Sequence, residues 1–121
     1  MERETKHCHG GLTMNICLSY GSRGEIIKAC QRMATEVQNG TLQVNQIDDD
    51  AMDSRLLTTH SPDPDIVIRT SGEYRLSNFL LWQLAYAEMF FLSKTWPELE
   101  KEDLIEVIRD YAGGRNRRYG K

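Results

Sequence analysis

Apolar residues in the first half of the chain follow two different patterns. Residues 12–20 (LTMNICLSY) predict a strand that is mostly buried on both faces. Between residues 24 and 38 the apolar side chains recur at helical spacing, and Asn39-Gly40 is a typical helix end, so this stretch predicts a helix. A polar stretch then leads into a short predicted helix over 50–58.

The second half repeats the alternation of a short apolar run and a longer one. Residues 65–70 (DIVIRT) predict a short strand rich in β-branched residues, followed by a polar loop over 71–75. Residues 78–92 predict a long apolar helix with Ser77 as its N-cap, and residues 98–112 predict an amphipathic helix that begins with acidic residues. Strands that alternate with helices indicate an α/β fold, a parallel sheet flanked by helices.

Composition and charge exclude several classes of protein. The chain has 121 residues, of which 40% are apolar and 27% charged, as in ordinary globular domains. A net charge of −3 argues against extensive nucleic-acid binding. The longest apolar run, Phe79 to Leu92, is too short for a bilayer and contains Gln83 and Glu88. We expect no leader sequence and no membrane span.

The cysteines indicate a reducing compartment. Cys8, Cys17 and Cys30 are odd in number and lack paired spacing, so we expect reduced thiols and a cytoplasmic protein. The segment KHCH (6–9) contains two histidines and a cysteine, but no second cluster completes a tetrahedral metal site. We interpret it as an ordinary segment.

A candidate anion site lies where the second strand ends. Arg69 closes that strand, Arg75 follows six residues later, and Ser77 stands at the expected helix start. The carboxyl ends of parallel strands form the usual ligand crevice, and two guanidinium groups with a hydroxyl suit a diphosphate. The residues also allow a plainer interpretation: two surface arginines, or an Arg69 that pairs with Glu73.

Two acidic features have ordinary explanations as well. Glu88 lies in the apolar segment AYAEMFF, where a carboxylate is paired, protonated, bound to a metal or turned outward. Residues 49–53 (DDAMD) are similar to the aspartate motif of the all-helical trans-prenyltransferases. The chain is too short and too strand-rich for that fold, so we interpret this motif as a solvated helix start.

One long block resembles a known family. SPDPDIVIRTSGEYRLSNFLLWQLAYAEMFF, followed by WPELEKEDL and RNRRYG, closely resembles the C-terminal half of cis-prenyltransferases, the undecaprenyl and dehydrodolichyl diphosphate synthases. LTMNICLSYGSRGEI is similar to the family's central strand and its glycine-arginine turn, with Ser22 where we expect glycine. The resemblance covers roughly residues 11–120, and we expect residues 1–10 to be a poorly ordered boundary segment.

The resemblance implies an activity, a metal and a set of site residues. The reaction is repeated cis condensation of isopentenyl diphosphate with an allylic diphosphate such as farnesyl diphosphate, assisted by Mg2+. By this resemblance, Arg69, Arg75 and Ser77 hold the isopentenyl diphosphate head group, and Glu73 lies beside them. Glu88 matches a carboxylate linked to magnesium and the dimer interface. Arg118 and Gly120 match a tail that reaches the diphosphate site of the partner subunit.

One departure from the family pattern limits these expectations. The family's N-terminal half carries an Asp-Gly-Asn motif that handles magnesium and the allylic diphosphate, and this sequence contains no such motif. We expect residues 11–121 to be the C-terminal half of a larger domain, inactive by themselves. A noncatalytic accessory subunit of a heteromeric enzyme and a plain dimerisation module are the other interpretations. The expected partners are an identical or related subunit and, through the product, a membrane surface on its cytoplasmic side.

Overall fold

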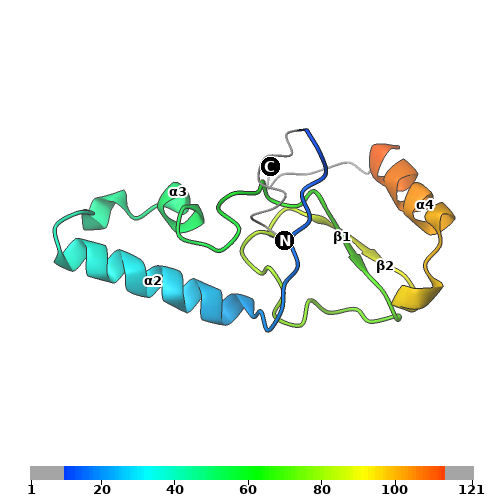
Figure 1. Cartoon of the computed structure of the whole chain (residues 1–121), viewed down its shortest axis with the longest axis horizontal. Coiled ribbons are helices and arrows are strands. Elements are labelled where there is room, and N and C mark those ends of the chain that lie inside the picture. Colours follow the sequence, from blue (N-terminus) through cyan, green and yellow to red (C-terminus); the bar gives the residue numbers. More distant parts are fainter. Residues whose placement is uncertain (1–9, 114–121) are drawn as a thin grey trace.

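The computed structural model describes residues 10–113. Helix α2 (Ser22–Gln38) and the short α3 (Asp49–Asp53) lie on one side of two strands, and α4 (Lys101–Ala112) lies on the other (Figure 1). Short 3-10 turns at Val44–Gln46 and Trp96–Glu98 precede α3 and α4. No helix in the described range is long and apolar enough to cross a membrane.

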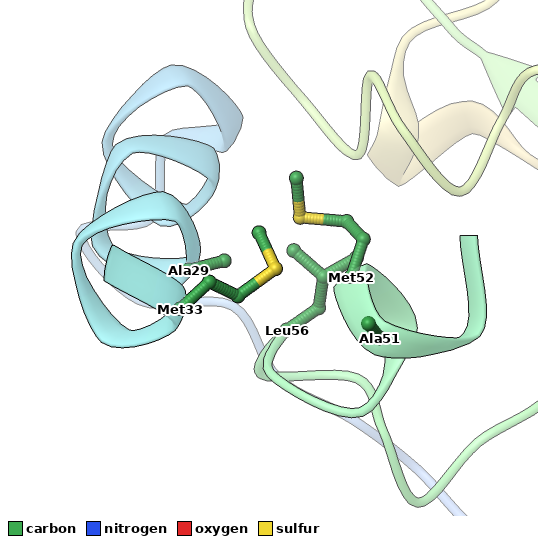
Figure 2. Close-up of a cluster of buried hydrophobic side chains, with 5 residues drawn as sticks. All are labelled: Ala29, Met33, Ala51, Met52 and Leu56. Atoms are coloured by element: carbon green, nitrogen blue, oxygen red, sulfur yellow. The ribbon is translucent and has the colours of Figure 1, made fainter. Parts of the chain in front are cut away.

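The α2 helix forms where its apolar spacing predicts it, and it buries one stripe. Its buried residues, Ser22, Glu25, Ala29 and Met33, fall three or four positions apart. Ala29 and Met33 point toward Met52 and Leu56 from the α3 region, and Ala51 completes this apolar cluster (Figure 2). Helix α3 begins with the exposed aspartates Asp49 and Asp50, as expected of a solvated helix start. Asp48 caps it, since Asp48 Oδ1 accepts a hydrogen bond of 2.8 Å from Ala51 N.

The sheet consists of two parallel strands in the described residues. β1 (Ile66–Arg69) pairs with β2 (Glu88–Phe91), so that Ile66 lies opposite Glu88 and Arg69 lies opposite Phe91. The predicted strand over 65–70 and the parallel pairing are therefore confirmed. The connection between the two strands is long enough to cross over, as a parallel pair requires.

The predicted helix over 78–92 is wrong. Residues 88–91 form β2, and residues 77–86 form consecutive turns. Ser77, Asn78 and Leu80 have φ values of 51°, 64° and 44°, a left-handed conformation that a right-handed helix cannot contain. The apolar run over residues 79–92 is therefore divided between turns and a strand. Residues 88–91 form the strand because pairing with β1 satisfies their backbone hydrogen bonds.

The predicted strand over 12–20 is also absent. This segment has no regular secondary structure and pairs with no strand in the described part of the chain. Its apolar side chains face solvent, with Leu12 97% and Leu18 82% exposed. A strand is stable only beside a neighbour that takes up its backbone hydrogen bonds, and residues 10–113 offer none here.

Helix α4 begins three residues later than predicted, at Lys101. Glu100 and Asp103 form a reciprocal capping box, in which Glu100 N donates to Asp103 Oδ2 at 2.8 Å. Asp103 also accepts a hydrogen bond of 2.9 Å from Lys94 Nζ, which attaches the start of α4 to the segment after β2. These two donors hold the pKa of Asp103 below its usual range, the backbone donor having the larger effect.

Candidate functional site

The loop after β1 is held against the segment that follows β2. Ser71 N donates to Lys94 O at 2.8 Å, and Gly72 N donates to Leu92 O at 2.9 Å. Gly72 has a φ of 64°, which a residue without a side chain adopts at little cost. Two backbone hydrogen bonds therefore fix where this loop carries the residues that follow Arg69.

A cavity of about 470 Å³ opens at the carboxyl ends of both strands. Its polar wall comes from the end of β1 and the following loop, and its apolar wall comes from both strands, residues 76 and 79, and the start of the 3-10 turn at Trp96. The lining residues are Arg69, Thr70, Ser71, Glu73 and Arg75 on the polar side, and Val67, Ile68, Leu76, Phe79, Phe91 and Trp96 on the apolar side. A cavity with a charged wall and an apolar wall suits a ligand with an anionic head and a hydrocarbon part.

The ion pair in the cavity differs from the Arg69–Glu73 pair that the sequence allowed. Glu73 pairs with Arg75, not with Arg69, and the Arg75 side chain is 65% exposed. No ion pair joins Arg69 to a carboxylate within residues 10–113. Two guanidinium groups against one carboxylate leave the cavity with a net positive charge, which favours an anion.

Ser77 and Glu88 lie elsewhere. Ser77 does not line the cavity, and it caps no helix because none follows it. Glu88 begins β2, opposite Ile66, whereas the cavity lies at the far end of the strands beside Arg69 and Phe91. Three residues of strand correspond to about 10 Å, so Glu88 is not a member of this cavity.

No magnesium site is formed by the described residues. Within residues 10–113, no three His, Cys, Asp or Glu side chains gather as a metal would require. Glu88, the predicted metal-linked carboxylate, forms its backbone hydrogen bond to Asp65 O at 2.9 Å and lies in the sheet. The donor set here therefore does not by itself fit Mg2+.

Several expectations lie outside the described residues. Arg118, Gly120 and the KHCH segment all fall in 1–9 or 114–121. Cys17 and Cys30 are described, and both are free thiols on exposed residues.

The N-terminus of α2 is already occupied by another part of the chain. Ser22 N donates to Asn78 O at 2.8 Å, and Arg23 N donates to Asn78 Oδ1 at 2.9 Å. Asn78 thus caps α2 from 55 residues away, a role that no local sequence signal shows. Gly21 permits this contact, because a Cβ there would lie 2.8 Å from Asn78 Nδ2.

A buried carboxylate supports this junction. Glu25 is 5% exposed and accepts hydrogen bonds from Leu57 N at 2.7 Å, from Gln83 Nε2 at 3.3 Å and from the Tyr20 hydroxyl. Burial, and then the hydrogen bond to Glu25, raise the pKa of Tyr20 to about 12. The network joins the segment before α2 to the turns before β2.

Sequence reasoning missed the apolar wall of the cavity. Phe91 and Trp96 reach it because β2 runs parallel to β1 and ends beside Arg69. The aromatic pair Phe90-Phe91 was a usable strand signal, but it was included in the predicted helix. Thr70 and Ser71 could have been expected at the cavity, since they directly follow the strand.

Comparison with known proteins decides the family. The family model described as "Putative undecaprenyl diphosphate synthase" matches residues 1–120. The chain belongs to this prenyltransferase family. Isoprenyl transferases from Geobacter sulfurreducens and Lactobacillus johnsonii are 47% and 49% identical to it, and each alignment covers 92% of this chain.

Solved prenyltransferase structures have the same fold. Lavandulyl diphosphate synthase from Lavandula x intermedia, solved in complex with dimethylallyl diphosphate, matches 86% of this chain with a TM-score of 0.81 and 37% identity. A probable undecaprenyl diphosphate synthase from Campylobacter jejuni matches 99% with a TM-score of 0.79 and 36% identity. These matches confirm the predicted α/β fold of the cis-prenyltransferases.

The matches cover only part of the family's usual length. This chain corresponds to 45% and 47% of the two isoprenyl transferases, and to 44% and 52% of the two solved structures. The chain therefore spans about half the length of the curated prenyltransferases that it matches.

Proposed function

We propose that this chain supplies the isopentenyl diphosphate site of an isoprenyl transferase that forms cis double bonds. The observation that carries the proposal is the cavity in which Arg69 and Arg75 meet at the carboxyl ends of two parallel strands. Membership of the undecaprenyl diphosphate synthase family supports it, as does the relatives' name, isoprenyl transferase.

The two arginines have complementary tasks in this proposal. Arg69 extends from the strand end and has no carboxylate partner within residues 10–113, so its guanidinium is available for a phosphate group. Arg75 sits on the loop and pairs with Glu73, so it must exchange that carboxylate for the diphosphate. Guanidinium groups bind phosphate oxygens through two parallel hydrogen bonds, which would orient the head group.

The apolar wall would take the short hydrocarbon part of the same substrate. Phe91 and Trp96 come much later in the sequence than the charged loop, and both line the same cavity. Burial of an isopentenyl group against aromatic side chains would contribute roughly 25 cal/mol per Å² of apolar surface removed from water. The arginines would set the position of the head group, and the aromatic side chains would set that of the carbon chain.

We further propose that the 121-residue polypeptide does not elongate isoprenoids on its own. The sequence has no Asp-Gly-Asn motif for the allylic diphosphate, and residues 10–113 form no magnesium site. Incubation with farnesyl diphosphate, isopentenyl diphosphate and Mg2+ should give no long polyprenyl product. Sustained formation of such a product would contradict this part of the proposal.

The binding site is tested by replacing one arginine and a matched control. Arg75→Ala should weaken isopentenyl diphosphate binding about tenfold or more, because a charge-assisted contact is worth about 1.5–3 kcal/mol. Arg32→Ala, on the exposed surface of α2 and outside the cavity, should leave the affinity unchanged. Isothermal titration calorimetry at fixed ionic strength measures both.

A second substitution separates a true site from general positive charge. Glu73→Gln removes the carboxylate that competes for Arg75, so we expect the affinity for isopentenyl diphosphate to rise severalfold. If Arg75→Ala leaves the affinity unchanged, Arg75 does not belong to the site. An accessory or dimerisation role would then explain the chain better.

Assembly with a second subunit also belongs to the proposal. Arg118 and Gly120 lie outside the described residues, so their contact with a partner's diphosphate site stays a prediction of the family resemblance. The test uses longer chains that also carry the family's N-terminal half. In a dimer that combines one such chain with Arg118→Ala and one with Arg75→Ala, one site would keep both wild-type groups if Arg118 acts across the interface. Such a mixed dimer should be more active than either mutant homodimer, and equal activities would reject the assignment.

A further inference from the structure

Ser22 connects the start of α2 to the turn over residues 77–81, which contains the cavity-lining Phe79. Its backbone N–H donates to Asn78 O, and its Oγ accepts a hydrogen bond of 3.0 Å from Leu81 N. With the bond from Arg23 N to Asn78 Oδ1, three hydrogen bonds join residues 22–23 to residues 78–81. Ser22 is 0% exposed, so its hydroxyl is shielded from water.

A second set of hydrogen bonds lies beside Ser22. Leu81 N donates to Ser22 Oγ, while the Tyr20 hydroxyl and Gln83 Nε2 both donate to the buried Glu25 carboxylate. The start of α2 and the turns over residues 77–86 are therefore joined at two points, through Ser22 and through Glu25.

The turn that Ser22 holds has a backbone that needs external support. Ser77, Asn78 and Leu80 all lie in the left-handed region, and only asparagine among them adopts it readily. Leu80 is also buried, so its conformation is fixed by packing and by neighbouring hydrogen bonds. A backbone in such a conformation persists only when several surrounding interactions hold it in place.

This turn forms part of the cavity wall. Leu76 and Phe79, on either side of Ser77 and Asn78, line the cavity with Arg75. The Phe79 ring meets the Tyr20 ring edge-on, with centroids 5.8 Å apart. A shift of the turn would move Phe79 and, through Leu76, the position of Arg75.

We propose that Ser22 is a positioning residue, whose hydroxyl holds the turn over residues 77–81 and thereby sets the wall of the ligand cavity. Family resemblance leads one to expect glycine at this position, and glycine offers no side-chain acceptor to Leu81 N. The inference rests on the proposed function, because it takes isopentenyl diphosphate as the ligand of the cavity. The hydrogen bond itself can be tested without a ligand.

The test compares the wild-type chain with Ser22→Ala and with the control Thr35→Val. Ser22→Ala removes the side-chain acceptor of the Leu81 N–H and keeps the Cβ. Thr35→Val removes a hydroxyl from the same helix, where Thr35 Oγ1 bonds Gln31 O at 2.9 Å on the exposed surface. Three quantities are measured: amide exchange at Leu81, the melting temperature, and the affinity for isopentenyl diphosphate.

We expect Ser22→Ala to act locally and on the ligand. Exchange at the Leu81 amide should become about five- to tenfold faster, while exchange at Ala29 in α2 stays the same. The affinity for isopentenyl diphosphate should fall about fivefold, as expected for one neutral hydrogen bond. Because coupling is reciprocal, isopentenyl diphosphate should slow exchange at Leu81 in the wild type and in Thr35→Val, and less so in Ser22→Ala.

Each other outcome overturns the proposal in a recognisable way. Unchanged exchange at Leu81 means that the hydroxyl does not hold the turn. Faster exchange with unchanged affinity, or loss of cooperative melting, assigns Ser22 to the stability of the fold alone. If the wild type fails to bind isopentenyl diphosphate, the proposed function fails and this inference with it, while the exchange at Leu81 still shows whether the turn is held.

Discussion

The α2–α3 region and the segment over residues 12–20 both carry apolar side chains, yet these side chains have opposite environments. Ala29 and Met33 of α2 are buried against Met52 and Leu56. The alternate residues of the segment, including Ile16 and Leu18, are exposed. Both were predicted to be buried, and only the helical region is.

The difference follows from where each element finds its hydrogen bonds. A helix closes its backbone hydrogen bonds within itself, so α2 needs only a small apolar partner, which the α3 region provides. A strand leaves its N–H and C=O groups open until a neighbouring strand pairs with them. An apolar pattern therefore shows that a segment favours burial, and not that the described residues contain its partner.

The largest effect on stability is expected from a cavity in the apolar cluster between α2 and the α3 region. Leu56→Ala should lower the free energy of unfolding by about 3 kcal/mol, because a buried leucine loses its transfer energy and leaves a cavity. Leu56 is 3% exposed, whereas its neighbour Leu57 is 67% exposed. Leu57→Ala is the matched control and should change stability by less than about 0.5 kcal/mol. Urea denaturation measures both, and equal effects would show that the cluster is not the core.

A smaller effect is expected from the ion pair that links the same two elements. Arg55 Nε donates to Glu36 Oε2 at 2.9 Å, and Arg55 Nη2 forms an ion pair with the same oxygen. Glu36→Gln should cost about 1 kcal/mol, and the loss should shrink as salt is added, since the pair is partly exposed. Glu106→Gln, on the exposed surface of α4, should have no such salt-dependent effect. If the loss of stability in Glu36→Gln does not depend on salt, it comes from altered packing and not from the lost ion pair.

The junction between the two regions should respond to alkaline pH. Tyr20 has a pKa of about 12 in the folded chain and an ordinary value of about 10 when unfolded. Its contribution to stability is therefore complete below about pH 10 and is lost as the pH rises toward 12. Tyr20→Phe should flatten the decline of unfolding free energy over this range.

Tyr74→Phe is the control for that titration, since Tyr74 lies on the exposed loop after β1. Tyrosinate absorbance should also lose its last ionisation step in Tyr20→Phe and keep it in Tyr74→Phe. An unchanged last step in Tyr20→Phe would contradict the assignment to Tyr20.

The smallest effect on stability is expected from the exposed segment itself. The double substitution Ile16→Lys and Leu18→Lys should change the free energy of unfolding by less than about 0.5 kcal/mol, because both side chains already face solvent. It should lower self-association, since exposed apolar side chains on an unpaired segment promote contacts between chains. Denaturation and light scattering measure the two effects. Marked destabilisation would show that the segment is packed after all.

The sequence by itself determined the elements whose causes are local. The spacing of apolar residues located α2 to within two residues, and the acidic start of residues 98–112 indicated α4. The β-branched run ending at Arg69 located β1. The sequence also predicted that Arg69, Glu73 and Arg75 lie close together, because all three fall within seven residues at the end of one strand. In the structure all three line the same cavity.

Only the tertiary structure decided the features that depend on distant partners. Residues 88–91 became a strand because β1 pairs with them, and residues 77–80 became a left-handed turn that Asn78 and Ser22 fasten to α2. Phe91 and Trp96 joined the cavity through that same pairing. Periodicity along a chain records how each residue relates to its near neighbours, whereas a hydrogen bond across 59 residues, such as that from Leu81 N to Ser22 Oγ, depends on how separate elements pack.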